Sequence, residues 1–166
     1  MTSEVNFVRQ QGFTDASPEA CAYRYPALMW QPRAIGILVL AGVVFQAWPF
    51  FLALWALLWF STALPHLNPF DAFYNRLAAD PKGLPRLVPA PAPRRFAQAM
   101  AGTWTLAIGL SLLFGWSIPA WTLEALLLVA LAALIFGRFC LGSYFYFLFT
   151  GQAGFANRTL PWSRSE

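Results

Sequence analysis

The sequence predicts an all-α membrane protein with four transmembrane helices, arranged as two hairpins joined by a cytoplasmic connector. Three observations predict this fold: a high apolar content, two long apolar regions and a one-sided distribution of basic residues. Of the 166 residues, 58% are hydrophobic and 11% are charged. Soluble domains contain about 25% charged residues, so a chain of this size and composition would expose too much apolar surface to water.

The N-terminal segment, residues 1–33, is polar and mixed, and we expect it in the cytoplasm. Ser17 followed by Pro18 predicts a helix start, because proline is favoured at the first helical position. Tyr25 and Trp30 then supply rings that favour the membrane interface.

The first transmembrane hairpin is predicted at residues 34–64, a run without a charged residue. As one helix it would be about 46 Å long, against a hydrocarbon core of roughly 30 Å. A break near Gln46 to Pro49 gives two shorter helices, since proline fits the start of the second. We therefore predict a hairpin, with a single long helix as the alternative.

Residues 65–95 form a polar connector. Asn68 before Pro69 predicts a helix N-cap, and Asp71 would lie at the positive end of that helix dipole. A short amphipathic helix is expected over residues 69–77. The many prolines that follow predict an extended, stiff strap.

The second hairpin is predicted at residues 96–149, with one span over 96–116 and another from Trp121 to about position 139 or beyond. Glu124 would fall in the first turn of the last span, where a carboxylate favours the helix dipole. We expect no Asp, Glu, Lys or Arg centrally in any span. The tail, residues 150–166, is polar.

The basic residues decide between topologies. In the four-helix prediction, all eleven Lys and Arg residues fall on the side of the termini and the connector, and the two tight turns contain none. This positive-inside pattern places both termini in the cytoplasm and the helices in a bacterial inner membrane. A three-helix alternative would put Arg9, Arg24 and Arg33 opposite the other eight.

Three stretches, NPFDAFYNRL, PRRFAQAMAG and FGRFCLGSYFYF, resemble a family of small bacterial membrane proteins known as a domain of unknown function (four-three-nine-five). The resemblance covers residues 30–149 and implies a four-helix membrane protein. The positions that carry the family motif are Arg95, Phe96, Ala97, Gln98, Gly102, Cys140 and Gly142.

Members of this family often carry a second cysteine three positions after the first, and some look linked to thioredoxin-like or sulfurtransferase proteins. Cys140 matches the first cysteine, whereas Ser143 occupies the second position. A dithiol, as in Cys-x-x-Cys redox motifs, needs both sulfurs. The thiol chemistry that the resemblance implies would therefore rest on Cys140 alone.

Cys140 is the candidate reactive thiol, although a buried free cysteine more often behaves as a small hydrophobe. A disulfide with Cys21 is not expected in a reducing compartment. Arg138 is predicted near the cytoplasmic edge, as an interfacial anchor or as a partner for Asp71, Asp80 or a lipid phosphate.

His66 is a candidate ligand for a chlorin magnesium or another metal, or else a hydrogen-bonded residue at the membrane interface. Gln46 and Gln98 could form hydrogen bonds between helices. Neither glutamine has an evident acidic, basic or nucleophilic partner in the sequence.

Several kinds of site are excluded. With one histidine and two cysteines, the chain alone lacks the ligands of a four-ligand zinc centre or a bis-histidine haem. It has no phosphate-binding loop, His-Glu-x-x-His motif or evident Ser-His-Asp set. The net charge is +4, but no basic helix or ribbon could enter a nucleic-acid groove. We therefore predict no metal, no cofactor, no nucleic acid and no enzymatic activity.

The sequence favours a non-catalytic accessory or scaffold subunit that packs in the lipid bilayer against a larger membrane complex or against copies of itself. Aromatic residues make up 17% of the chain and are enriched in the cores of protein interfaces. Two alternatives stay open. One is a component of a sulfur or thiol redox pathway that uses Cys140, and the other is a pigment- or quinone-contacting subunit of a respiratory or photosynthetic complex.

Overall fold

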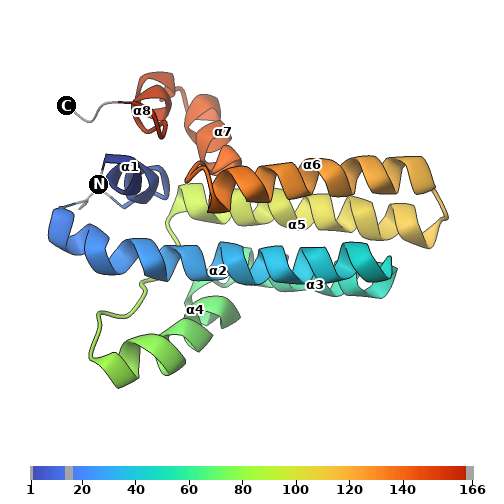
Figure 1. Ribbon diagram of the computed structural model, residues 1–166, viewed down its shortest axis with the longest axis horizontal. Helices are drawn as coiled ribbons and strands as arrows, with labels where there is room; N and C mark the ends of the chain where they lie inside the picture. The colour runs from blue at the N-terminus through green and yellow to red at the C-terminus, as the bar shows by residue number, and fades with distance from the viewer. Residues whose placement is uncertain (1, 14–16, 164–166) are drawn as a thin grey trace.

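The computed structural model describes residues 2–13 and 17–163, and within them the chain forms helices and loops without a strand (Figure 1). Residues 1, 14–16 and 164–166, which belong to the predicted N-terminal segment and the predicted tail, lie outside the described residues. The elements are α1 Thr2–Gln10, α2 Pro18–Phe45, α3 Trp48–Ala63, η1 Pro65–Leu67, α4 Pro69–Tyr74, η2 Asn75–Ala79, η3 Asp80–Lys82, α5 Ala92–Leu113, α6 Ser117–Ile135, α7 Leu141–Phe149 and α8 Ala153–Arg158.

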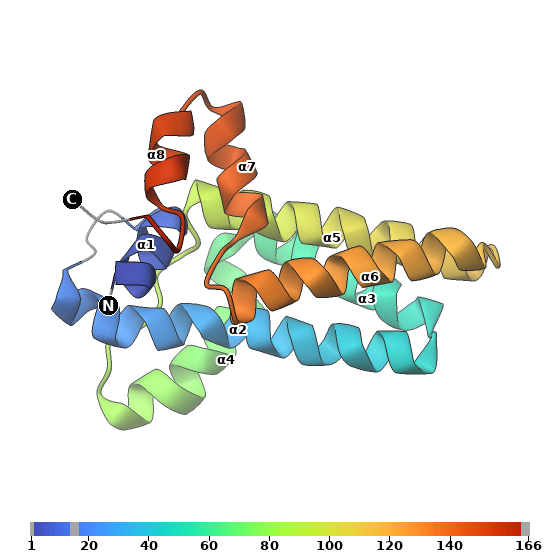
Figure 2. The same ribbon diagram turned by 45° about the horizontal axis from the view of Figure 1, so that its top comes forward.

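The four long helices, α2, α3, α5 and α6, lie side by side as a bundle of two antiparallel hairpins (Figures 1 and 2). Apolar side chains from all four helices meet along its axis, since each helix turns one stripe inward. The core consists of Ile35, Val39, Phe51, Leu54, Leu58, Phe70, Ile108, Leu127 and Leu131.

The predicted break in the first apolar run is confirmed. α2 ends at Phe45, and Gln46 adopts a left-handed conformation with φ of 48° that reverses the chain. Pro49 then lies in the first turn of α3, where a backbone N–H would have no partner within the helix, so the N–H that proline lacks costs no hydrogen bond. The second turn follows the same plan, with Gly115 at φ of 71° between α5 and α6.

The helix of the first hairpin is much longer than predicted. α2 starts at Pro18, where Ser17 Oγ accepts from the N–H of Ala20 at 3.2 Å, and it continues without interruption through Pro26 and Pro32. The predicted start of the hairpin at residue 34 is therefore not a helix boundary. With 28 residues, α2 is about 42 Å long and extends beyond a hydrocarbon core of roughly 30 Å.

Three helices are long and apolar enough to cross a membrane: α2, α5 and α6. The fourth, α3, is equally apolar but has 16 residues, which corresponds to about 24 Å. The all-helical class is confirmed, and three of the four predicted spans meet the length that a full crossing requires.

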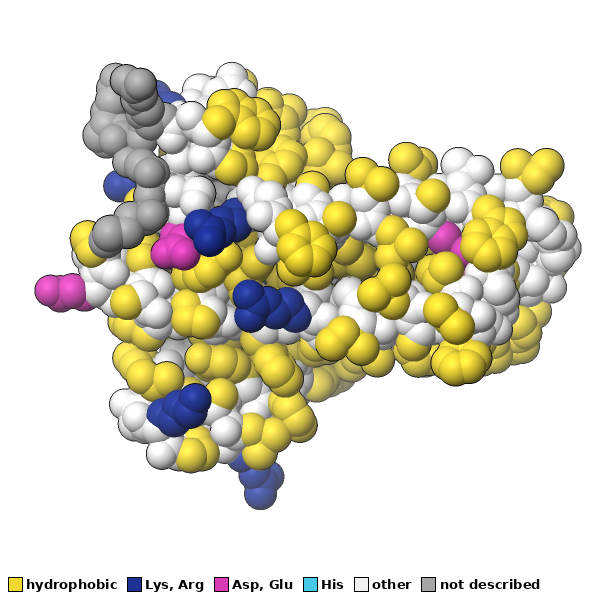
Figure 3. Space-filling view, viewed as in Figure 1, with side chains coloured by type: hydrophobic (Ala, Val, Ile, Leu, Met, Phe, Trp, Pro, Cys, Tyr) yellow, Lys and Arg dark blue, Asp and Glu magenta, His cyan; other side chains and the backbone are white. Residues whose placement is uncertain are grey.

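The remaining elements gather at the end of the bundle opposite the two turns, and we call this end the head. It contains α1, the connector from η1 to the strap at residues 84–91, and α7 with α8 (Figures 1 and 2). On the face shown in Figure 3, the Lys and Arg side chains lie at this end. Asn6 on α1 links the N-terminal and C-terminal segments of the head, because its Nδ2 donates to the carbonyls of Leu160 and Ser163 at 3.0 Å each.

The last apolar run does not continue as one helix. α6 ends at Ile135, Arg138 adopts a φ of 56°, and α7 leaves the direction of the bundle (Figure 1). The prediction that the final span extends to about position 139 or beyond is therefore wrong. Glycine at 137 and the left-handed residue after it turn the chain, and the aromatic segment that follows forms α7.

Candidate functional site

A buried ion pair joins the connector to the second hairpin. Arg94 Nη2 on α5 donates to Asp71 Oδ1 on α4 at 2.6 Å, and both residues are more than nine-tenths buried. The same nitrogen donates to Gln31 Oε1 on α2 at 2.7 Å, and Gln98 Nε2 donates to that oxygen at 2.9 Å. These four residues, the buried polar cluster, tie α2, α4 and α5 together.

The predicted N-cap directs Asp71 into this cluster. Asn68 Oδ1 accepts from the N–H of Phe70 at 3.1 Å at the start of α4, and Asn68 Nδ2 donates to Asp71 Oδ2 at 2.9 Å. Both carboxylate oxygens are thus paired, as a buried charge requires. Three buried polar atoms of the cluster have no hydrogen-bond partner among the described residues: Gln31 Nε2, Arg94 Nη1 and Gln98 Oε1.

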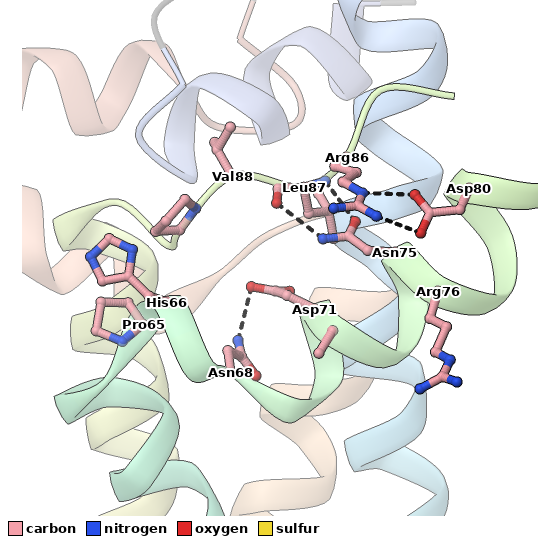
Figure 4. Close-up of a pocket in the computed structure, with 12 residues that line it drawn as sticks. Pro65, His66, Asn68, Asp71, Asn75, Arg76, Asp80, Arg86, Leu87 and Val88 are labelled. Carbon is pink, nitrogen blue, oxygen red and sulfur yellow. Dashed lines mark hydrogen bonds and ion pairs between the residues drawn. The ribbon is translucent and has the colours of Figure 1, made fainter. Parts of the chain in front are cut away.

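A pocket of about 510 Å³ lies next to the cluster, between α4 and the strap (Figure 4). Asp71 lines it, and so does His66, which is exposed and whose ring makes no hydrogen bond with a described residue. Asn75 holds the strap in place, because its side chain bonds the N–H of Leu87 at 2.8 Å and the carbonyl of Leu87 at 3.3 Å. One wall of the pocket is therefore a strap that Asn75 holds, and the pocket also contains an exposed imidazole.

An exposed ion pair completes the rim of this pocket. Arg86 donates to both carboxylate oxygens of Asp80, each at 2.7 Å (Figure 4). These hydrogen bonds, helped by charge attraction, hold the pKa of Asp80 below its ordinary value and raise the pKa of Arg86. Water surrounds both groups, so the pair positions the strap more than it stabilises the fold.

Cys140 lies between α6 and α7, and its thiol is buried and free. Its backbone N–H donates to Gln10 Oε1 on α1 at 2.8 Å, so the N-terminal helix covers this position. Ser143 Oγ lies 3.3 Å from Cys140 Sγ and donates to it, at the position where the family resemblance places a second cysteine. Among the described residues, no acid, base or cation contacts the thiol.

Arg138 has protein partners other than Asp71 or Asp80, which the sequence left as the alternative to an interfacial anchor. Its Nη1 donates to Ser3 Oγ at 2.7 Å, and its Nη2 lies 3.5 Å from Glu4 Oε1 on α1. Its guanidinium also lies over the ring of Tyr25, 5.2 Å from the centroid. Because the chain turns directly before Arg138, the side chain points at α1 and not at the connector.

Arg95 and Phe96 hold neighbouring helices onto α5. Arg95 Nε donates to the carbonyl of Thr62 at 3.0 Å and so satisfies a free carbonyl at the end of α3. The ring of Phe96 contacts those of Tyr146 and Phe149 at centroid distances of 5.9 and 6.2 Å. These two motif residues therefore act in packing.

The small motif residues mark close approaches between helices. A Cβ on Gly142 would lie 2.7 Å from Cα and Cβ of Ala97, so α7 crosses α5 where neither helix has room for a larger side chain. A Cβ on Gly102 would lie 3.0 Å from Trp59 on α3. With Gln98 in the buried polar cluster, the motif positions of α5 connect it to α2, α3 and α7.

Glu124 is not in the first turn of its helix. α6 begins at Ser117, so Glu124 lies two turns further in, and it is 1% exposed. Both carboxylate oxygens accept from Gln46 Nε2, at 3.2 and 3.0 Å. The predictions that Glu124 caps the helix, that Gln46 has no acidic partner and that the spans contain no central charged residue are therefore wrong. Because the helix starts earlier than Trp121, Glu124 is shifted inward.

A family described as Domain of unknown function (DUF4395) matches residues 29–150 of the sequence. The chain belongs to this family. No curated protein and no solved structure matches it. The family segment contains the connector, α7 and the bundle except for the first part of α2, and α1 and α8 lie outside it. Gln10 therefore covers Cys140 from a segment that flanks the family domain.

Sequence reasoning missed Gln31 and Arg94, although the structure places both at the centre of the head. A signal was present. Gln31 and Gln98 are polar residues at the ends of apolar runs, and Asp71 and Arg94 are opposite charges in one connector. Within the described residues, no group of three or more His, Cys, Asp and Glu could hold a metal ion.

Proposed function

We propose that the protein is a non-catalytic accessory subunit of a bacterial inner membrane, which binds a larger membrane protein through the connector side of its head. The observation that carries this proposal is an exposed apolar surface around the pocket. Phe73 and Leu77 are 52% and 58% exposed on α4 and η2, and Val88 on the strap is 54% exposed. Figure 3 shows apolar side chains gathered over α4.

Two features favour a protein partner at this surface. Trp30 on α2 stacks on Phe73 with centroids 5.6 Å apart and an angle of 11°, which makes a rigid aromatic surface. Next to it lies the polar pocket with His66 and Asp71. Apolar aromatic contacts beside a few hydrogen-bonding groups are typical of protein interfaces, whereas lipid chains use only the apolar part.

The proposed topology has four spans and both termini in the cytoplasm. α3 lies along α5 of the other hairpin, to which Arg95 and the close approach at Gly102 attach it. A span shorter than the hydrocarbon core is accommodated by local thinning of the bilayer at modest cost. The basic residues of the head then face the cytoplasm.

The non-catalytic part of the proposal is supported by how the polar residues are used. The buried polar cluster joins three helices, and the motif residues Arg95, Phe96 and Gly142 pack helices together. A catalytic set needs a nucleophile or acid within reach of a base and of a substrate. Here the polar groups of the site form hydrogen bonds that hold the head to the bundle.

Co-purification tests this proposal. Protein tagged in its own host and extracted in mild detergent should migrate above its mass of 18.5 kDa, with a second membrane protein at fixed stoichiometry. The double variant Phe73→Ser, Leu77→Ser should lose that partner while circular dichroism stays unchanged. A matched control is Ile118→Ser, which is 82% exposed at the opposite end of the bundle and should retain it. A lone monomer in native extracts would contradict the proposal.

A thiol function at Cys140 is the second candidate, favoured by the hydroxyl of Ser143 at 3.3 Å from its sulfur. A hydrogen bond of this kind stabilises a thiolate relative to a thiol. α1 must move before a reagent can reach the sulfur. A mass-spectrometric count of maleimide adducts tests this candidate, because Cys140 should be labelled only if α1 moves away from it. A Cys140→Ala strain with full activity would contradict the candidate.

A further inference from the structure

A second pocket, of about 590 Å³, lies on the other side of the head, between the end of α1, the start of α5 and the α7–α8 region. Its walls are mainly aromatic rings and prolines. The lining residues are Arg9, Gly12, Phe13, Pro91, Ala92, Pro93, Tyr146, Phe147, Gln152 and Phe155. Arg9 alone among these described lining residues is charged, so the pocket combines an apolar wall with one positive charge.

The charge of Arg9 is not balanced within the described chain. Its guanidinium has no ion pair or hydrogen bond with a described residue, and no carboxylate lines the pocket. By contrast, Arg86 and Arg94 each have an aspartate at hydrogen-bond distance. A guanidinium offers five N–H donors in a plane that suits phosphate and carboxylate oxygens. Tyr146, which carries a phenol hydroxyl, also lines this pocket.

Neighbouring contacts hold the end of α1, which carries Arg9, against α7 and the strap. Gln10 Oε1 accepts from the N–H of Cys140 at 2.8 Å, and Gln11 Nε2 lies 3.5 Å from Ser143 Oγ, so the last turn of α1 is attached to α7. Gly12 then adopts a φ of 91° and approaches the strap, where a Cβ would lie 2.9 Å from Pro91. The pocket is therefore formed before any ligand enters, which lowers the entropic cost of binding.

The position of the pocket indicates its ligand. Ala92 is the first residue of α5, a candidate membrane span, so the pocket lies at the level where this helix enters the bilayer. α7 supplies Tyr146 and Phe147 to the pocket, and its axis points away from the direction of the bundle (Figure 2). Lipid phosphates lie at this depth, with glycerol and acyl chains next to them.

We propose that this pocket binds the headgroup of an anionic phospholipid, with the phosphate at Arg9 and the Tyr146 hydroxyl and the glycerol end of the lipid against Phe147 and Phe155. The site is independent of the partner surface on α4. It also gives a role to α1, which lies outside the family segment.

The test measures binding of short-chain lipids to the full-length protein in neutral detergent by native mass spectrometry. Dioctanoyl phosphatidylglycerol should bind to the unchanged protein. The Arg9→Gln variant should raise the dissociation constant of this lipid about tenfold, the usual effect of losing one charge-assisted hydrogen-bonded contact. The matched control is Arg158→Gln, which removes the same charge from the exposed α8 and should bind like the unchanged protein.

Two further arms identify the source of the anion and protect against a misfolded variant. Dioctanoyl phosphatidylcholine and inorganic phosphate should each bind at least about tenfold more weakly than phosphatidylglycerol, because the site needs both net negative charge and apolar surface. Tyr146→Phe keeps the ring contacts with Phe96 and Phe147 but lacks the hydroxyl, and it should bind a few-fold more weakly. Equal binding by Arg9→Gln, by phosphatidylcholine or by free phosphate would overturn the proposal.

Discussion

The two ends of the bundle handle buried charge in different ways. At the head, the Asp71 carboxylate is held by Arg94 and Asn68, an opposite charge and an amide. At the turns, the Glu124 carboxylate has only the amide of Gln46 among the described residues. Because an ionised carboxylate in an apolar interior requires a compensating charge, the head can contain charged groups and the turn end favours a neutral acid. The difference predicts how each end responds to substitution.

The largest effect is expected at the head. Asp71→Ala leaves Arg94 buried without a counter-charge, which should lower the free energy of unfolding by about 3–5 kcal/mol. Reversible unfolding in mixed dodecyl sulfate micelles measures it. The double variant Asp71→Leu, Arg94→Met removes both charges and should lower the free energy of unfolding by less than the single variant does. A larger loss in the double variant would show that the ion pair itself stabilises the head.

A packing substitution at the same end should have a smaller effect. Gly142→Ala introduces a Cβ that would lie 2.7 Å from Ala97, and the displacement of α7 should cost about 1–3 kcal/mol in the same unfolding assay. Gly154→Ala is the matched control, because the nearest atom to its Cβ is the mobile end of Arg158 at 3.8 Å. Equal stability of the two variants would mean that α7 does not rest on α5 as described.

At the turn end, Glu124→Gln should change the free energy of unfolding by less than about 1 kcal/mol, since a neutral amide oxygen can still accept from Gln46. Glu124→Leu should cost more, because it leaves a buried donor without a partner. If Glu124→Gln destabilises the protein as much as Asp71→Ala does, Glu124 is charged and the contrast between the two ends is wrong.

The smallest effect is expected at the exposed pair of the head. Since Arg86 lowers the pKa of Asp80 in the folded protein, the contribution of this pair is complete above the ordinary carboxyl pKa of 3.8 and is lost as the pH falls through the lower folded value. Amide hydrogen exchange in the strap should therefore accelerate only below that ordinary pKa. In Asp80→Asn the exchange rate, corrected for intrinsic pH dependence, should already be raised at neutral pH and should not rise further at acid pH.

Elements with strong local signals were predictable. The turn at Gln46, the helix start after Ser17 and the N-cap at Asn68 each follow from residues next to them in the sequence. The family was also identified from short motifs, and the match over residues 29–150 confirms it.

The failures have a common physical cause, which is that the deciding contacts are distant in the sequence. Pro26 and Pro32 lie inside α2, although proline usually ends a helix. The partners of Arg138 after the break lie on α1, and no local pattern shows them. Likewise, the partners of Glu124 and Arg94 come from helices far along the chain, and a charge pattern alone does not pair them.

The bond from Asn6 to the carbonyls of Leu160 and Ser163 has a consequence for biosynthesis. Nearly the whole polypeptide must leave the ribosome before α1 can acquire these acceptors, whereas each hairpin is complete as soon as its own second helix emerges. The hairpins can therefore form in order, and the contacts of α1 with the C-terminal residues form last. A truncated chain released early would lack these C-terminal contacts of α1, a feature that a quality-control protease could use to separate finished molecules from unfinished ones.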